Sequence, residues 1–142
     1  MKKTAAALSV HGKMPPMDIQ DIARRAAQKL IYIHPMKTDG VIMGTPVLYP
    51  GGERVIVYLS TDRPGLVFVS DFEGGRKRAM MEGVREAFDA AIATMAGDPP
   101  LISEGLSIYL RVPPSDVPDA IMRIANASAE ALRSALGYQD RP

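Results

Sequence analysis

Two short turns constrain the fold of this chain more than any other feature. Pro50-Gly51-Gly52 and Asp62-Arg63-Pro64-Gly65 interrupt a region rich in β-branched and aliphatic residues, and Gly and Pro are the residues that tight turns require. Such short connections join antiparallel strands, whereas parallel strands need a crossover of about a dozen residues or more. The segments Val41 to Tyr49, Arg54 to Leu59 and Gly65 to Ser70 are therefore predicted to form an antiparallel meander.

Apolar residues recur at helical spacing in three other segments. The first begins at Asp18, a good N-cap, and is ended by Pro35; the second runs from Arg76 to Ala96. The third follows Pro113-Pro114-Ser115 and stops before Gly137, a residue typical of the position after a helix. Each of these segments is predicted to be a helix with one buried side.

Two shorter apolar segments, Leu101-Ile102 and Leu106 to Val112, flank Glu104-Gly105 and are predicted to form a hairpin. The expected order is helix, three-stranded antiparallel meander, helix, two short strands, helix. Because strands and helices do not alternate one by one, the predicted class is α+β, with helices packed on an antiparallel sheet.

A chain of 142 residues is most simply one domain. We expect a flexible arm over residues 1–17, a single α+β domain over 18–137 and a tail over 138–142. The opening apolar run Ala5 to Val10 is shorter than the ~7–15 residues of a signal-peptide core. With no cysteine and no apolar stretch near the ~20 residues of a membrane span, the expected location is the cytoplasm, away from membranes.

Charge is unevenly distributed along the chain. Residues 1–37 hold seven bases and two acids, a net charge of +5, whereas residues 38–75 hold two bases and five acids, a net charge of −3. Arg24, Arg25 and Lys29 fall on the polar side of the first predicted helix. They are candidates to contact an acidic partner or a phosphate backbone, and the simpler interpretation is a solvated helix surface.

Ser70 to Arg78 combines a strand end, two acids, two glycines and three bases. Helix starts normally carry acids, because the helix dipole is positive there. Gly75, Arg76, Lys77 and Arg78 are therefore predicted to bind an anion or an acidic partner. The spacing matches neither a P-loop nor a dinucleotide fingerprint.

Asp71 and Glu73 are the best carboxylate pair, and Lys77 is near them in sequence. Two carboxylates on one side of a strand end could hold Mg²⁺ or act as acid and base. A metal-dependent or phosphate-directed enzyme is therefore kept as an alternative. The simpler interpretation is that Asp71 ends the strand and Glu73 offsets the bases. His11 and His34 have no acid or His three or four residues ahead, so no catalytic residue, metal ligand or cofactor is predicted.

Binding of nucleic acid usually needs bases interleaved with aromatic residues. The chain has no Trp, and Tyr32, Tyr49, Tyr58 and Tyr109 fall near or within predicted core elements. No stacking platform is predicted. A protein partner is favoured, and a nucleic acid stays open as the alternative.

The chain resembles an uncharacterised family of small bacterial and phage proteins of unknown function. The similar motifs are Thr45-Pro46-Val47-Leu48, the strand Arg54 to Leu59, Val69 to Gly74, and the helix Ala120 to Ser128. This chain has Glu73 inserted before the Gly of the family's T/S-D-x-G turn. The resemblance implies a fold and a phage or mobile-element context, with no catalytic residue.

The element order is also similar to that of the dimeric type III secretion chaperones, which keeps a homodimeric chaperone as a further alternative. The favoured prediction is a small cytoplasmic interaction or regulatory protein, inhibitor-like, that acts by binding a macromolecule. This prediction depends on the absence of catalytic motifs, on the net positive charge of residues 1–37 and on the family resemblance.

Overall fold

The computed structural model describes residues 18–30, 32–36 and 40–137. The predicted arm and tail lie outside these ranges. The chain divides into two units, residues 1–30 and 31–142. The first unit contains helix α1 (Ile19–Leu30). Asp18 caps this helix as predicted, because its Oδ1 accepts the N–H groups of Gln20 and Asp21 at 3.0 and 3.3 Å.

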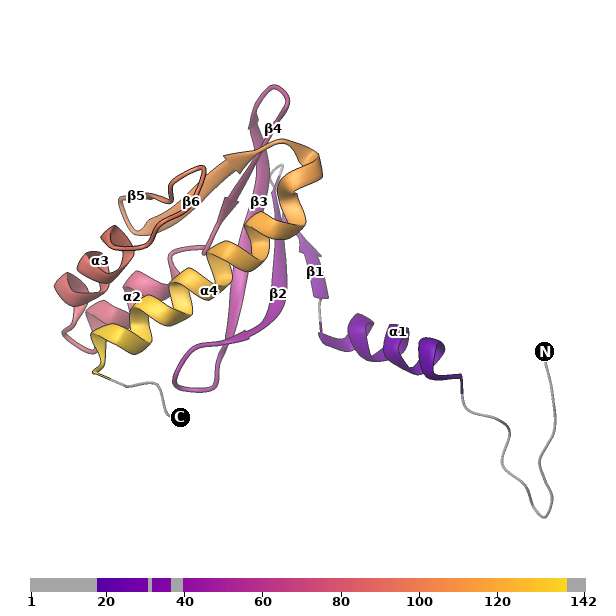
Figure 1. Cartoon of the computed structure of the whole chain (residues 1–142), viewed down its shortest axis with the longest axis horizontal. Coiled ribbons are helices and arrows are strands. Elements are labelled where there is room, and N and C mark those ends of the chain that lie inside the picture. Colours follow the sequence, from indigo (N-terminus) through magenta and orange to yellow (C-terminus); the bar gives the residue numbers. More distant parts are fainter. Residues whose placement is uncertain (1–17, 31, 37–39, 138–142) are drawn as a thin grey trace, which may run out of the picture. The chain divides into compact units, whose positions relative to one another are not determined.

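The second unit is a six-stranded antiparallel sheet in the order β1-β2-β3-β4-β6-β5 (Figure 1). Its strands are β1 (Tyr32–Pro35), β2 (Val41–Leu48), β3 (Arg54–Arg63), β4 (Leu66–Ser70), β5 (Ile102–Glu104) and β6 (Ser107–Val112). The α+β class is confirmed. The described residues contain four α-helices, one of which is α1 of the first unit, and six strands, one more than predicted.

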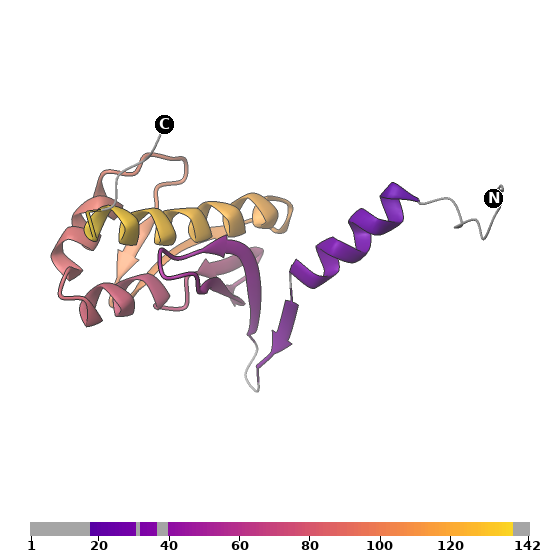
Figure 2. The ribbon, with the colours of Figure 1, turned by 90° about the horizontal axis from the view of Figure 1, so that it is seen from below.

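Helices α2 (Gly74–Met81), α3 (Arg85–Ala93) and α4 (Val117–Ala135) belong to the second unit. Helix α4 follows a 3-10 turn (Pro114–Asp116) and packs against β2, β3, β4 and β6. Helices α2 and α3 pack against α4, and Figure 2 shows α4 along one side of the strands. The core between the layers contains Val57 of β3, Phe88 of α3 and Ile124 of α4, all fully buried.

The prediction that the first helix continues to Pro35 is wrong. Helix α1 ends at Leu30, and Tyr32–Pro35 pairs with β2 as an edge strand. Aromatic and β-branched residues such as Tyr32 and Ile33 favour strands, and a residue before proline is disfavoured in helix. An edge strand also tolerates Pro35, which has no N–H group to donate.

The long helix predicted over Arg76 to Ala96 is two helices. Gly83 lies between α2 and α3 with a φ of +73°, a left-handed conformation that glycine adopts without steric cost. Met80, expected in the buried stripe, is 45% exposed, whereas Phe88 is fully buried as predicted. The break turns α3 so that its own apolar side reaches α4.

Candidate functional site

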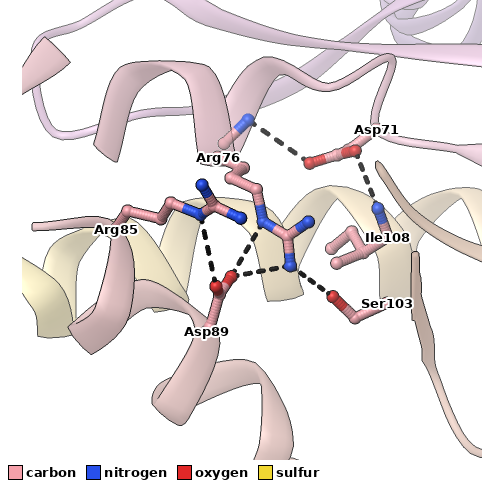
Figure 3. A network of polar contacts seen from close by, with 7 residues as sticks. Asp71, Arg76, Arg85, Asp89, Ser103 and Ile108 are labelled. Atoms are coloured by element: carbon pink, nitrogen blue, oxygen red, sulfur yellow. Dashed lines mark hydrogen bonds and ion pairs between the residues drawn. The ribbon is translucent and has the colours of Figure 1, made fainter. Parts of the chain in front are cut away.

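Asp71 lies directly after β4, and its side chain points into the protein. The residue is 1% exposed. Its Oδ1 accepts the backbone N–H groups of Glu73 and Ile108, both at 3.2 Å. Its Oδ2 accepts the N–H of Gly75 at 3.3 Å and the hydroxyl of Ser128 at 2.8 Å. This carboxyl group therefore joins the start of α2 to β6 (Figure 3). Through Ser128 it is also joined to α4.

The N–H groups at the start of α2 are thus already occupied by the carboxyl group of the chain's own Asp71. The N–H groups of Glu73 and Gly75 are among the donors that a helix start leaves without a partner inside the helix. Asp71 accepts both of them. Gly75, predicted as part of an anion site, is buried and uses its N–H for this internal contact.

Tyr49 extends the Asp71 network to the end of β2. Its hydroxyl lies 2.9 Å from Ser128 Oγ. Because Ser128 donates its single hydroxyl hydrogen to Asp71, Tyr49 donates to Ser128. Burial is the main cause that raises the pKa of Tyr49 to about 12, so the phenol keeps this hydrogen at neutral pH. Tyr49, Ser128 and Asp71 form a continuous buried chain of hydrogen bonds.

Burial also raises the pKa of the Asp71 carboxyl group, against the lowering effect of its four hydrogen bonds. The folded state therefore binds a proton on Asp71 more tightly than the unfolded chain does. By linkage, the contribution of Asp71 to stability is largest at pH values below its pKa in the unfolded chain. This contribution decreases as the pH rises toward the higher pKa that Asp71 has in the folded protein.

We expect this pH dependence to appear as a difference between the wild type and Asp71→Asn, which cannot titrate. The Tm advantage of the wild type over the variant should be larger near pH ~4 than near pH ~7. Thermal melts of both proteins across this range measure it. A wild-type advantage that increases toward neutral pH would contradict the raised pKa.

Two consecutive residues after Asp71 have left-handed backbone. Phe72 and Glu73 have φ values of +55° and +66°. A non-glycine residue in this region costs roughly 1–2 kcal/mol, and such residues concentrate at functional sites. The turn sends Asp71 inward and leaves Phe72 44% exposed, so the predicted arrangement of Asp71 and Glu73 on one side of a strand does not form.

Arg76 is buried and anchored between α3 and β5. Its Nε donates to Asp89 at 2.8 Å, and its Nη2 donates to Ser103 at 2.7 Å (Figure 3). Arg85 also approaches Asp89, with its Nε 3.7 Å from Oδ2. Predicted as an anion-binding residue, Arg76 is instead engaged by an acid and a serine of its own chain.

Lys77 and Arg78 lie at the surface of α2. Lys77 Nζ is 3.0 Å from Glu73 Oε1, and Arg78 Nε is 2.9 Å from Glu53 Oε1. The Arg78 guanidinium stacks on Tyr49, 4.2 Å from the ring centroid. The other predicted residues, Arg24, Arg25 and Lys29, belong to α1 in the first unit, and their side chains are outside the described part.

A hollow of about 200 Å³ opens beside this turn. We call it the basic hollow, because three of its lining side chains are bases. Its lining residues are Tyr49, Arg54, Ile56, Asp71, Phe72, Gly74, Lys77 and Arg78. The sequence prediction therefore located two of the three bases, and it missed Arg54 because this residue comes from β3.

The side of the sheet opposite α4 carries a row of large side chains, which we call the open face. In β3, Val55 and Val57 point to the core, so the alternate residues Ile56 and Tyr58 point the other way. Cross-strand partners share a face, which extends the row to the neighbouring strands. The open face comprises Tyr32, Ile42, Leu48, Arg54, Ile56, Tyr58, Phe68, Tyr109 and Arg111, together with Phe72 after β4.

The aromatic rings of the open face contact one another. Tyr58 stacks on Phe72 with a centroid distance of 5.9 Å and meets the edge of Phe68 at 6.1 Å. Phe68 and Tyr109 are 4.9 Å apart. Tyr32, Tyr58 and Tyr109 lie on the side of the sheet away from the core, but Tyr109 is only 8% exposed. The absence of a stacking platform for nucleic acid stays a prediction.

Arg111 covers one end of this row. Its guanidinium lies 5.2 Å from the centroid of Phe68 and 5.1 Å from that of Tyr109. Asp62 holds it in place through a 2.6 Å hydrogen bond from Nη2, and this contact lowers the pKa of Asp62. The rings at this end are thus shielded, whereas Phe72 at the other end presents its ring to solvent.

Within the described residues, no group of three or more His, Asp or Glu side chains is placed to hold a metal ion. Glu73 points to Lys77, and Asp71 points to the interior. His34, on β1, packs edge-on against Tyr32 at 5.0 Å. In the part of the chain that is described, no helix is long and apolar enough to cross a bilayer.

Comparisons with known proteins give no relative from which a role could be transferred. No family model matches the chain, and no curated protein or solved structure is significantly similar to it. The resemblance to a phage-associated family therefore stays a prediction, as does the homodimer.

Proposed function

We propose that this chain is a small cytoplasmic binding protein that captures an apolar segment of another protein on its open face. The observation that carries the proposal is the row Ile56, Tyr58 and Phe72, continued by Leu48 on β2, on the side of the sheet opposite α4. Leu48 and Phe72 are exposed, whereas Ile56 and Tyr58 are half-buried. Apolar residues grouped at the surface in this way mark interaction sites in soluble proteins. Aromatic side chains dominate the energy of many protein interfaces.

The arrangement of charge supports a protein partner over a nucleic acid. Arg111, the base nearest to the aromatic pair of Phe68 and Tyr109, lies over their rings and is paired with Asp62. Single-stranded nucleic acid needs ring faces that are free for stacking, and at this end of the row Arg111 covers them. Arg54 and Lys77 border the free end of the row, which favours a segment whose apolar residues are flanked by acids.

Phe72→Asn is expected to weaken capture strongly while preserving the fold. Asn tolerates left-handed backbone better than Phe, so the variant removes the exposed ring and relieves strain at φ +55°.

A photoreactive residue at Leu48, 51% exposed on the open face, should cross-link a partner protein in cells. The same residue at Met122, 40% exposed on α4, is the matched control.

We expect an adduct of higher mass from position 48, none from position 122, and none from position 48 when Phe72→Asn is added. With the captured protein purified, Phe72→Asn should weaken binding about tenfold or more. Equal cross-linking from both positions would contradict the proposal. An adduct of two copies of this chain would instead identify the open face as a self-association surface.

A further inference from the structure

The basic hollow brings together three bases from two elements that are distant in sequence. Arg54 comes from β3, whereas Lys77 and Arg78 come from α2. The apolar part of the lining includes Ile56 and Phe72, and the volume of about 200 Å³ accommodates a small ligand. Its surface therefore offers positive charge on one part and apolar contact on another.

We propose that the basic hollow binds a compact oxyanion, the phosphate or carboxylate group of a small ligand, through Lys77, Arg78 and Arg54. Such groups are recognised by charge-assisted hydrogen bonds from Arg and Lys, which are about twice as strong as those between neutral groups. This inference does not depend on the capture of a protein by the open face.

Arg78 is held in position before any ligand arrives. Its guanidinium stacks on the Tyr49 ring at 4.2 Å, and its Nη1 donates to the carbonyl oxygen of Gly74 at 3.1 Å. Tyr49 is itself fixed by its hydrogen bond to Ser128. A preorganised side chain loses less conformational entropy on binding than a mobile one, so Arg78 is suited to act as the fixed donor.

The acids that pair with Lys77 and Arg78 are exchangeable. Glu73 contacts Lys77 with side-chain exposures of 40% and 59%, and Glu53 contacts Arg78 from a side chain that is 67% exposed. Exposed ion pairs of this kind contribute little, at most about 1 kcal/mol. An incoming oxyanion can therefore replace either glutamate at small cost, and the glutamates act as internal competitors.

The donors are side chains rather than the start of α2. The N–H groups of Glu73 and Gly75 are occupied by Asp71, and Arg76 is occupied by Asp89 and Ser103. The proposed site therefore differs from the anion site predicted from sequence: it keeps Lys77 and Arg78, adds Arg54 and leaves out Gly75 and Arg76.

Titration of the ¹⁵N-labelled full chain with sodium phosphate, and separately with sodium acetate, tests the proposal by NMR. Sodium chloride at matched ionic strength is the reference, because it screens charges without offering an oxyanion. We expect saturable shifts of the amides of Phe72, Gly74 and Lys77. Saturation by phosphate alone would assign a phosphorylated ligand, and saturation by acetate alone would assign a carboxylate. No saturable shift with either salt would overturn the proposal.

Variants with opposite expected effects separate binding from general charge effects. Lys77→Gln should weaken the binding of the saturating anion about tenfold, because it removes one charge-assisted contact. Glu73→Gln should strengthen binding several-fold, because it removes the competitor of Lys77. Arg85→Gln is the matched control: it deletes an equal charge and an equivalent i,i+4 pair with Asp89 on α3. An equal loss of affinity in Arg85→Gln and Lys77→Gln would contradict a site at the hollow.

Discussion

Asp71→Ala is expected to lower the free energy of unfolding by about 3–5 kcal/mol, because it leaves several buried donors without an acceptor. The carboxyl group accepts the N–H groups of Glu73, Gly75 and Ile108 and the hydroxyl of Ser128. Each unsatisfied buried donor costs roughly 1–3 kcal/mol. Against a total stability of about 5–15 kcal/mol for a domain, this is a large loss. Urea denaturation of the full chain measures it.

Asp62→Ala is the matched control for this prediction. Asp62 makes a shorter contact, 2.6 Å from Arg111 Nη2, but its side chain is 39% exposed. Because water can replace a partner at the surface, its removal should cost much less than the removal of Asp71. Asp71→Asn should lie between the two, since the amide keeps one acceptor oxygen. Equal losses in Asp71→Ala and Asp62→Ala would refute a structural role for the buried network.

The strands of the turn-rich region could be predicted because their signals are local. Turn residues and runs of β-branched residues specify β2, β3 and β4 without reference to the rest of the chain. Strand β1 has only four residues, and helical spacing continued into it from α1. The break at Gly83 was also missed, since a single glycine within a helical pattern is often tolerated.

The open face could not be separated from the core by pattern alone. Strand β3 has apolar residues on both sides, with Val55 and Val57 alternating with Ile56 and Tyr58. That pattern fits a central strand that is covered on two sides. It fits equally a central strand whose second side carries a binding surface. Only the packing of α4 against one side of the strands distinguishes the two.

The sequence indicated that the segment from Ser70 to Arg78 is unusual, but it did not predict which contacts its side chains make. The direction of the Asp71 side chain follows from the left-handed conformations of Phe72 and Glu73, which are uncommon for these residue types. Its partner Ser128 lies 57 residues later in the chain. Neither feature has a signal in the local pattern, which is why Asp71 was interpreted as the end of a strand or as half of a carboxylate pair.

Gly75→Ala is expected to destabilise the protein by about 1–3 kcal/mol or more, because the added methyl group has no space. A Cβ at this position would overlap Ser128 Oγ and lie 2.7 Å from Cζ of Phe88. Both neighbours are fully buried, and Ser128 is fixed by Asp71 and Tyr49. Relief would require α2 to move away from α4, which would also stretch the hydrogen bond from the Gly75 N–H to Asp71.

Gly51→Ala separates this clash from the general effect of replacing glycine. A Cβ at Gly51 would meet no atom within 4 Å, and Gly51 is not among the glycines with positive φ. The control should leave stability unchanged or raise it by about 0.4–1 kcal/mol, because alanine restricts the unfolded chain. If Gly75→Ala were as stable as Gly51→Ala in parallel urea melts, α2 would not pack on α4 through this glycine. Destabilisation confined to Gly75→Ala would instead show that direct packing of the first turn of α2 against Ser128 fixes the position of this turn. The same turn borders the basic hollow.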